Sequence, residues 1–237
     1  EGEKTMEELL RELKKPSERR DFSQIQGIFY FKNDHLSELK YRSLIKNIDE
    51  LPMPAYDLLP IEKYGKALEL WVKGIPVYHS RGCTGGCTFC SCWPAMGNIS
   101  NKLAGSTTPL WRTKSVDKTL QELKYIEDTW KRDLFVFIDD TWNVNPKWNE
   151  DFADKYKKQY GLSTDWFAFM RLDFIRRDII RGIFKKLYDS KLRQLIIGFE
   201  CYDQQLLDSV NKELKVKYNE KTINWIHYHC PKIFVQG

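Results

Sequence analysis

Residues 75–92 read IPVYHSRGCTGGCTFCSC, an apolar run followed directly by a cysteine-rich loop. The run at 75–79 is typical of a short buried strand. Three cysteines, Cys83, Cys87 and Cys90, follow it with the spacing C-x3-C-x2-C. Glycines between them permit the positive φ angles that so tight a loop needs. The stretch therefore predicts a strand that carries three thiols on a loop at its carboxyl end.

Four more short apolar runs follow along the chain and alternate with amphipathic helical patterns. The runs are 134–138, 166–170, 195–199 and 233–235, and the helical patterns cover 116–130, 147–160, 175–187 and 219–229. Repeated strand–helix units predict an α/β fold with one parallel sheet, either doubly wound or barrel-like. A barrel would need at least one strand beyond the fifth run, so we expect a sheet that is cut short at its C-terminal end.

Both architectures place the functional site at the carboxyl ends of the parallel strands. Beyond the cysteine loop, these positions hold Asp139 and Asp140 after the second run, Arg171 after the third and Glu200 after the fourth. We therefore expect these side chains to meet the three thiols at one edge of the sheet.

The N-terminal part has a different pattern. Residues 1–15 predict a helix, with Thr5 and Glu8 spaced for a capping box. Residues 27–40 predict a β-hairpin that turns at Asn33-Asp34.

A proline-containing segment at 48–62 reads as an extended connector. It divides the chain into two predicted parts. The first is a small helix and hairpin extension with its linker over 1–62, and the second is the strand–helix domain over 63–237.

The composition is that of an ordinary soluble protein. Net charge is +5, charged residues make up 30% and apolar residues 42%. The basic residues are scattered in pairs, which favours solvated surfaces over a nucleic-acid-binding patch. No apolar run is long enough for a membrane span and no signal peptide pattern opens the chain, so a cytoplasmic location is expected. The six cysteines are then not expected to form disulfides.

The clustered cysteines indicate a bound metal. Four cysteines saturate a [4Fe–4S] cluster, so three leave one iron open to a chelating ligand. The alternative is a structural zinc site with Cys92 as the fourth ligand. Zinc sites usually use two separated knuckles, and Cys90 and Cys92 are too close in sequence for that arrangement. Cys201 and Cys230 stand alone and read as buried apolar residues.

The loop resembles the signature of the radical S-adenosylmethionine superfamily, including the aromatic Phe89 before the last cysteine. Further motifs resemble its cobalamin-associated branch: GEKT at 2–5, LPMPAY at 51–56, FIDDT at 137–141 and IGFE at 197–200. The resemblance covers nearly the whole chain and implies a partial (β/α) TIM-like barrel of parallel strands. The commoner superfamily pattern has Gly-Gly-Glu where this chain has Ile-Asp-Asp.

The resemblance implies an enzyme that reductively cleaves S-adenosylmethionine at a [4Fe–4S] cluster and so generates a 5′-deoxyadenosyl radical. Methyl transfer or oxidative rearrangement of an unknown substrate would follow. The electron would come from a reductant such as flavodoxin or ferredoxin. Cobalamin is implied only if a further N-terminal domain exists, and residues 1–62 would then be the tail of that domain.

Individual residues take roles from the same resemblance. Cys83, Cys87 and Cys90 would hold the cluster. Phe89 would place its backbone against the adenine, and the segment at Asp139 and Asp140 would face the ammonium group. Arg171 would bind the ligand carboxylate, and Glu200 would face the ribose or the amino group.

Simpler interpretations stay open beside these. Asp140 could cap a loop, and Arg171 could form a salt bridge with Asp173. For the whole chain, the alternative is a non-catalytic metal module that holds zinc or carries electrons through an iron–sulfur cluster. A third interpretation is a fragment that binds S-adenosylmethionine without turning it over.

Overall fold

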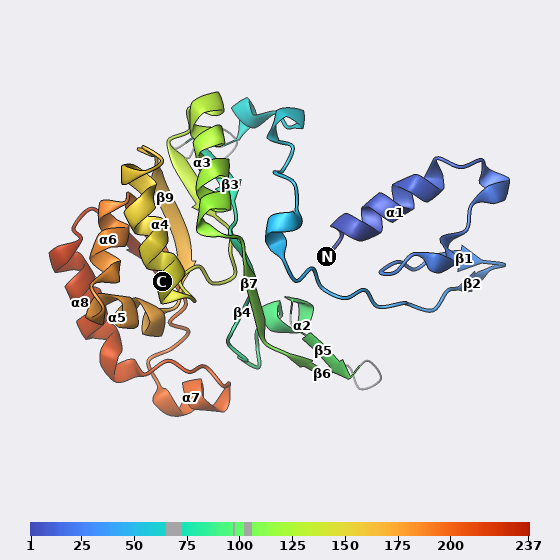
Figure 1. The fold of residues 1–237 in the computed structure, drawn as a ribbon. Helices are drawn as coiled ribbons and strands as arrows, with labels where there is room; N and C mark the ends of the chain where they lie inside the picture. Colours follow the sequence, from blue (N-terminus) through green and yellow to red (C-terminus); the bar gives the residue numbers. More distant parts are fainter. Residues whose placement is uncertain (65–72, 97, 102–105) are drawn as a thin grey trace. The chain divides into compact units, whose positions relative to one another are not determined.

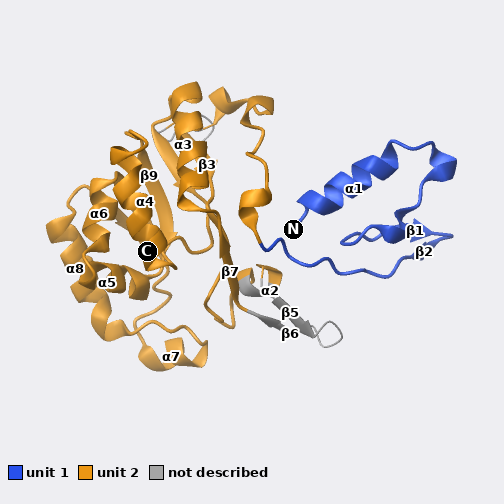
Figure 2. Cartoon of the chain, viewed as in Figure 1, with its two compact units in different colours: residues 1–46 blue, residues 47–237 orange. Residues whose placement is uncertain are grey.

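The computed structural model describes residues 1–64, 73–96, 98–101 and 106–237. They form two compact units, Glu1–Lys46 and Asn47–Gly237 (Figure 2). The division therefore falls earlier in the chain than the one expected at 62/63. The assignment of 1–62 to a separate domain and its linker stays a prediction.

The first unit contains the expected helix and hairpin. Its elements are α1 (Glu3–Leu13), the 3-10 helices η1 (Ser17–Arg19) and η2 (Phe22–Gln24), and the strands β1 (Phe31–Lys32) and β2 (His35–Leu36). The strands pair antiparallel. Asn33 and Asp34 turn between them with φ of 51° and 61°, a left-handed conformation in which Asn and Asp are enriched. The predicted hairpin is confirmed, with shorter strands.

The predicted capping box is wrong. Gly2 is the N-cap of α1, so Thr5 lies inside the helix. The Thr5 hydroxyl donates to the carbonyl oxygen of Gln26 at 2.9 Å, and Glu8 forms an ion pair with Arg42. Both side chains thus bind residues distant in sequence, which a local pattern does not reveal.

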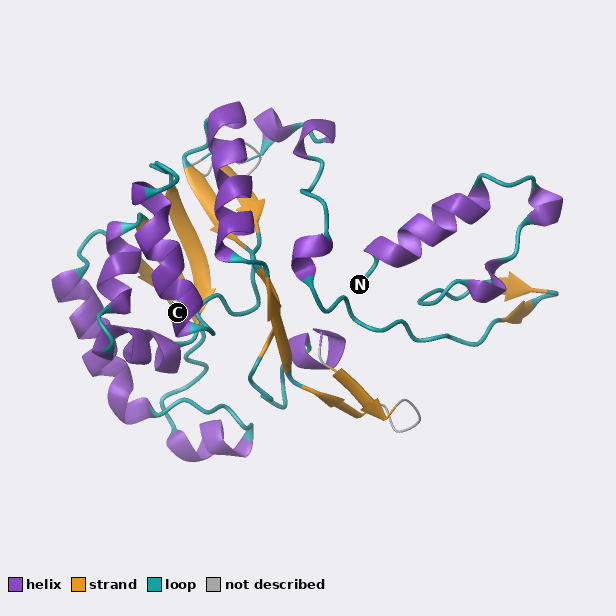
Figure 3. Ribbon diagram, viewed as in Figure 1, coloured by secondary structure: helices purple, strands orange, loops and turns teal. Residues whose placement is uncertain are grey.

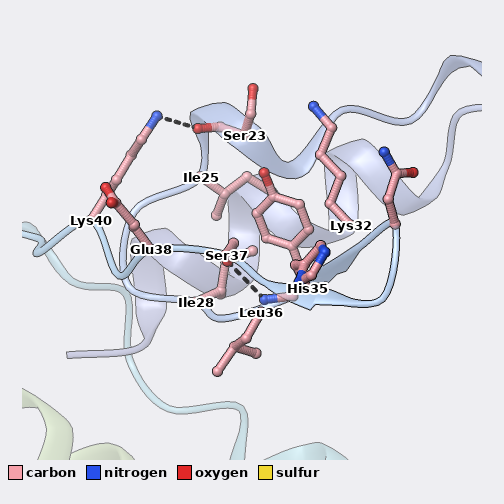
Figure 4. A pocket seen from close by; sticks show the side chains of 11 residues that line it. Ser23, Ile25, Ile28, Lys32, His35, Leu36, Ser37, Glu38 and Lys40 are labelled. Carbon is pink, nitrogen blue, oxygen red and sulfur yellow. Dashed lines mark hydrogen bonds between the residues drawn. The ribbon is translucent and has the colours of Figure 1, made fainter.

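The hairpin and the segment before it surround a hollow of about 410 Å³ (Figure 4). Ile25, Ile28 and Leu36 contribute apolar surface there, and Lys40 closes one side through a hydrogen bond to the carbonyl oxygen of Ser23. None of the predicted site residues lines this hollow.

The other helices and strands of the described residues belong to the second unit. Figure 3 distinguishes the helices, strands and loops. Its strands are β3 (Gly74–Val77), β4 (Ser80–Cys83), β5 (Asn98–Asn101), β6 (Ser106–Thr108), β7 (Leu110–Thr113), β8 (Leu134–Phe137), β9 (Asp165–Met170), β10 (Leu192–Ile197) and β11 (Phe234–Gln236). Its α-helices are α2 (Cys92–Met96), α3 (Val116–Trp130), α4 (Pro146–Lys158), α5 (Leu172–Ile180), α6 (Ile183–Asp189), α7 (Gln204–Ser209) and α8 (Asn219–His229). The 3-10 helices are η3 (Ile48–Glu50), η4 (Tyr56–Leu58), η5 (Ile61–Lys63) and η6 (Val216–Tyr218).

Five strands form the central sheet, in the order β11-β10-β9-β8-β3. Every pair of neighbouring strands in it is parallel. The five strands lie in the sheet in the order in which they occur along the chain, and at least one helix lies between each strand and the next. The predicted α/β class and parallel sheet are confirmed. Over the described residues the sheet is open, and a TIM barrel is not shown.

The helices α3, α4 and α6 form a layer on the sheet, because α3 packs on α4 and α4 packs on α6 (Figure 1). Alternate side chains of β3 and β8 are buried, as expected for one well-covered face. An aromatic cluster fills the space between β8, β9 and α4. Its members Phe137, Trp142, Phe152 and Trp166 have ring centroids within 6.0 Å of their neighbours. The core therefore lies between this sheet face and the helices.

Two features were not expected from the sequence. The helix predicted over 175–187 is two helices, α5 and α6, separated at Gly182. The residues from Ser80 to Cys83 are a strand, β4, that pairs antiparallel with β7.

No helix in the described part of the chain has both the length and the apolar character to cross a bilayer.

Candidate active site at the cysteine loop

The cysteine loop leaves the end of β4 and borders a cavity of about 350 Å³ at the carboxyl ends of the central strands. The cysteines and polar residues around it are Cys83, Cys87, Cys90, Cys92, Asp140, Thr141, Arg171, Asp173, Glu200 and Lys212. Phe89 also lines the cavity, together with apolar side chains of β9 and β10. Of the predicted site residues, only Asp139 does not line it.

Two hydrogen bonds hold the thiol of Cys83. Its Sγ accepts hydrogen bonds from the backbone N–H of Gly85 at 3.3 Å and from the Thr141 hydroxyl at 3.1 Å. A side chain at position 85 would begin 2.5 Å from Nη1 of Arg171. Glycine therefore lets the guanidinium of Arg171 lie directly against the loop.

Two residues that follow α7 fix the middle of the loop. Asn211 donates from its side-chain amide to the carbonyl oxygen of Gly86 at 2.9 Å. The backbone N–H of Thr88 donates to the carbonyl oxygen of Val210, also at 2.9 Å. The loop is therefore supported from both the β8 end and the region beyond β10.

The thiols are not arranged for a single metal ion. Among the residues that the structure describes, no three His, Cys, Asp or Glu side chains group closely enough to hold one. A tetrahedral zinc ion, with Zn–S bonds of about 2.3 Å, would need its sulfurs within about 4 Å of one another. A cuboidal cluster binds each thiolate through a different iron, which spreads the sulfurs apart. Three thiols on one loop are the number of protein ligands that a [4Fe–4S] cluster with one open iron would need.

Charge around the thiols differs from one to the next. Burial raises the pKa of Cys87, while the nearby Lys212 and Arg171 lower it. Burial also raises the pKa of Cys92, and the neighbouring carboxylate of Asp140 adds to that rise. Cys92 thus lines the cavity in surroundings that favour its neutral thiol.

Arg171 is held rigidly at the start of α5. Its backbone exchanges two hydrogen bonds of 3.1 Å with the side-chain amide of Asn143. Its guanidinium binds both carboxylate oxygens of Asp173 at 3.0 Å and reaches Glu213 at 3.3 Å. The salt bridge that the sequence offered as an alternative is therefore present, and it orients the group toward Gly85 and the cavity.

Glu200 and Lys212 form an ion pair at the cavity. Their Oε1 and Nζ atoms are 2.8 Å apart, and the Lys212 side chain is only 14% exposed. Glu200 has a positive φ of 63°, which is uncommon for a non-glycine residue. The Nζ of Lys212 also lies 5.9 Å from the ring centroid of Phe89. Sequence reasoning missed Lys212, which follows no strand of the sheet.

Asp139 and Asp140 point in different directions. Asp139 is buried, and its Oδ1 accepts from the backbone N–H groups of His79 at 3.1 Å and Ser80 at 2.5 Å. Asp140 is exposed, and its Oδ2 accepts from the backbone N–H of Gly82 at 2.9 Å. The alternation of the preceding strand β8 continues through these residues, so only the second side chain reaches the cavity.

The buried Asp139 is expected to make stability fall as the pH rises. Burial raises the pKa of Asp139 to about 7, although hydrogen bonds from Ser80 and His79 oppose the rise. The folded chain therefore keeps a proton that an unfolded Asp, with a pKa of about 3.9, has lost. The free energy of unfolding should decrease between about pH 4 and the Asp139 pKa, by at most about 1.4 kcal/mol for each pH unit from this group. Urea unfolding at several pH values measures the slope.

Asp139→Asn is the matched variant for that measurement, because it keeps an acceptor oxygen and removes the ionisation. Its unfolding free energy should depend less on pH over the same interval. A slope equal to that of the natural chain would show that another group is responsible.

No family model matches the chain. Curated methyltransferases are similar in sequence. An uncharacterised methyltransferase of Pyrococcus horikoshii is 31% identical over 215 residues, which cover 90% of this chain and 41% of the relative. The bacteriochlorophyllide d C-12(1)-methyltransferase of Chlorobaculum tepidum is 25% identical over 166 residues, covering 69% of this chain and 32% of the relative. The chain thus spans less than half the length of either relative.

Solved structures share the fold. OxsB, a cobalamin-dependent S-adenosylmethionine radical enzyme solved with aqua-cobalamin and S-adenosylmethionine, has a TM-score of 0.75 and 19% identity, covering 100% of this chain and 32% of that chain. TsrM from Kitasatospora setae, a radical S-adenosylmethionine methyltransferase solved with cobalamin and a [4Fe–4S] cluster, has a TM-score of 0.69 and 11% identity, covering 99% and 44%. At these identities the likeness establishes the fold alone.

Proposed function

We propose that this chain is the cluster-binding and S-adenosylmethionine-binding core of a radical S-adenosylmethionine enzyme whose reaction is a methyl transfer. One observation carries the proposal. The three thiols of the C-x3-C-x2-C loop line the same cavity as Arg171, Glu200 and Lys212, at the carboxyl ends of a parallel sheet.

In this proposal Cys83, Cys87 and Cys90 hold three irons of a [4Fe–4S] cluster. When bound, the cluster supplies an open iron for the amino and carboxylate groups of S-adenosylmethionine and the electron that breaks a carbon–sulfur bond of its sulfonium. The carboxyl-end location agrees with the general rule for parallel sheets.

The remaining side chains would bind and orient the ligand. Arg171 is preorganised by Asp173 and Glu213, and a guanidinium held in this way suits a carboxylate. Glu200 would accept a hydrogen bond from the ribose or the amino group, and Lys212 holds the Glu200 side chain in place through their ion pair. The backbone of Phe89 would contact the adenine.

The comparisons support the finer parts of the proposal. Methyl transfer is in the names of both sequence relatives and of TsrM, and OxsB and TsrM were both solved with cobalamin. We accordingly propose that the whole protein uses cobalamin and that the open sheet is part of a (β/α) barrel. The electron would come from a small reductant such as flavodoxin or ferredoxin. The comparisons name no methyl acceptor for this chain.

Anaerobic reconstitution of the chain with iron and sulfide tests this function. We expect about four irons per chain, and release of methionine or a methylated product from S-adenosylmethionine after reduction with dithionite. One zinc per chain and no turnover would favour the metal module instead. Binding of S-adenosylmethionine to a loaded cluster without cleavage would favour a chain that holds the ligand but does not react.

A further inference from the structure

Three consecutive side chains after β8 contact three successive parts of the strand that leads to Cys83. Asp139 binds residues 79 and 80, Asp140 binds residue 82, and Thr141 binds the sulfur of Cys83 itself. The resemblance assigned the two aspartates to ligand binding, but their contacts point to the cysteine strand.

Asp139 anchors the corner between β3 and β4. Its Oδ1 accepts from the N–H of His79, from the N–H of Ser80 and, at 2.6 Å, from the Ser80 hydroxyl. The Asp139 side chain is fully buried, so water cannot replace these bonds. The Asp139 side chain therefore fixes the direction in which β4 leaves the sheet.

Asp140 holds the next part of the same strand. It accepts from the N–H of Gly82, which has a φ of 87° and directly precedes Cys83. The bond therefore restrains the peptide whose rotation would move the Cys83 side chain.

Thr141 contacts the thiol itself. Its Oγ1 lies 3.1 Å from Sγ of Cys83 and 2.8 Å from the carbonyl oxygen of Asp140. A hydroxyl has one proton to donate, and an anionic acceptor binds it more strongly than a neutral one. When Cys83 is a thiolate, the hydroxyl is therefore drawn to the sulfur.

We propose that Asp139, Asp140 and Thr141 are positioning residues, in which the two aspartate side chains fix the strand that presents Cys83 and the threonine hydroxyl binds its thiolate. The effect of Thr141 on the reduction potential of a cluster rests on the proposed function, whereas the role of the aspartates in holding Cys83 in position does not. Because hydrogen bonds to cluster sulfurs influence the reduction potential, the hydroxyl would raise the potential of a cluster bound there.

The fixing of Cys83 is tested on the chain without a cluster. The rate of Cys83 alkylation by iodoacetamide is measured by mass spectrometry, with Cys201 as the internal reference. Asp140→Ala should increase the rate about tenfold, the equivalent of one charged hydrogen bond, and Asp140→Asn, which keeps an acceptor, should stay near the natural chain. Unchanged Cys83 reactivity in Asp140→Ala, with or without weaker S-adenosylmethionine binding, would overturn the proposal.

The effect of Thr141 on the reduction potential is tested after reconstitution. The cluster is titrated with a reductant and its reduced form is detected by electron paramagnetic resonance. Thr141→Val should bind as much iron as the natural chain and titrate at a more negative potential, whereas Thr141→Ser should keep the natural potential. An unchanged potential in Thr141→Val would overturn the role of the hydroxyl. A natural chain that binds no cluster would refute the proposed function instead, and the alkylation result would still decide the role of Asp140.

Discussion

A Cys87→Ala variant is expected to lose its iron–sulfur cluster and all measurable cleavage of S-adenosylmethionine. Cys87 lies in the middle of the loop and lines the cavity, and its thiolate would be one of only three protein ligands. Removing a partner that merely supports a metal ligand already lowers metal affinity by about 10–100-fold. Loss of the ligand itself should therefore lower cluster affinity by more than about 100-fold. Iron content after anaerobic reconstitution and methionine release measure the two effects.

Cys201→Ala provides the control for this experiment. Cys201 is also a partly buried thiol, but it does not line the cavity. It should bind a full complement of iron and react at the natural rate. A Cys87→Ala variant that retained four irons and turnover would remove the basis of the proposed chemistry.

A Gly82→Ala variant should be strongly destabilised and should bind the cluster poorly. Gly82 pairs with Trp111 in the ribbon of β4 and β7 at a φ of 87°, and an added Cβ would lie 2.0 Å from the carbonyl oxygen of Leu110. A left-handed conformation costs a non-glycine residue about 1–2 kcal/mol. Relief of the clash costs about 1–3 kcal/mol more. Together they predict a loss of about 2–5 kcal/mol in the free energy of unfolding.

Gly161→Ala separates the two costs. Gly161 also has a positive φ, of 63°, but an added Cβ would meet no atom within 4 Å. Urea unfolding of both variants should show a smaller loss for Gly161→Ala, and its cluster content should be unchanged. Equal losses in the two variants would mean that the close approach to Leu110 contributes nothing.

The sequence predicted the central sheet because its signals are local. The apolar runs are bounded by polar residues and alternate with helical patterns, and the runs at 75–79 and 134–138 correspond to β3 and β8. The pairing of β4 with β7 was missed because residues 80–83 lack a strand pattern, and their partner lies about thirty residues later. The break at Gly182 was missed because both helices continue the same apolar spacing.

The rule that functional sites lie at the carboxyl ends of parallel strands predicted most of the residues of the candidate site. It placed Asp140, Arg171 and Glu200 beside the cysteines, although their roles stay predictions. It could not tell which of Asp139 and Asp140 faces the cavity. The alternation of buried and more exposed side chains along β8, continued through these two residues, would have done so. Lys212 and Asn211 follow a short helix instead of a strand, so only the folded chain reveals them.

The distance in sequence between the cysteine loop and its supports has a consequence for biosynthesis. The amide of Asn211 binds Gly86 across 125 residues. At about 5–20 residues per second, a ribosome needs about 6–25 s to make the intervening chain. Throughout that interval the loop lacks the contacts that Val210 and Asn211 make with it. A metallocluster inserted into the finished loop must therefore arrive late in translation or after the chain is released.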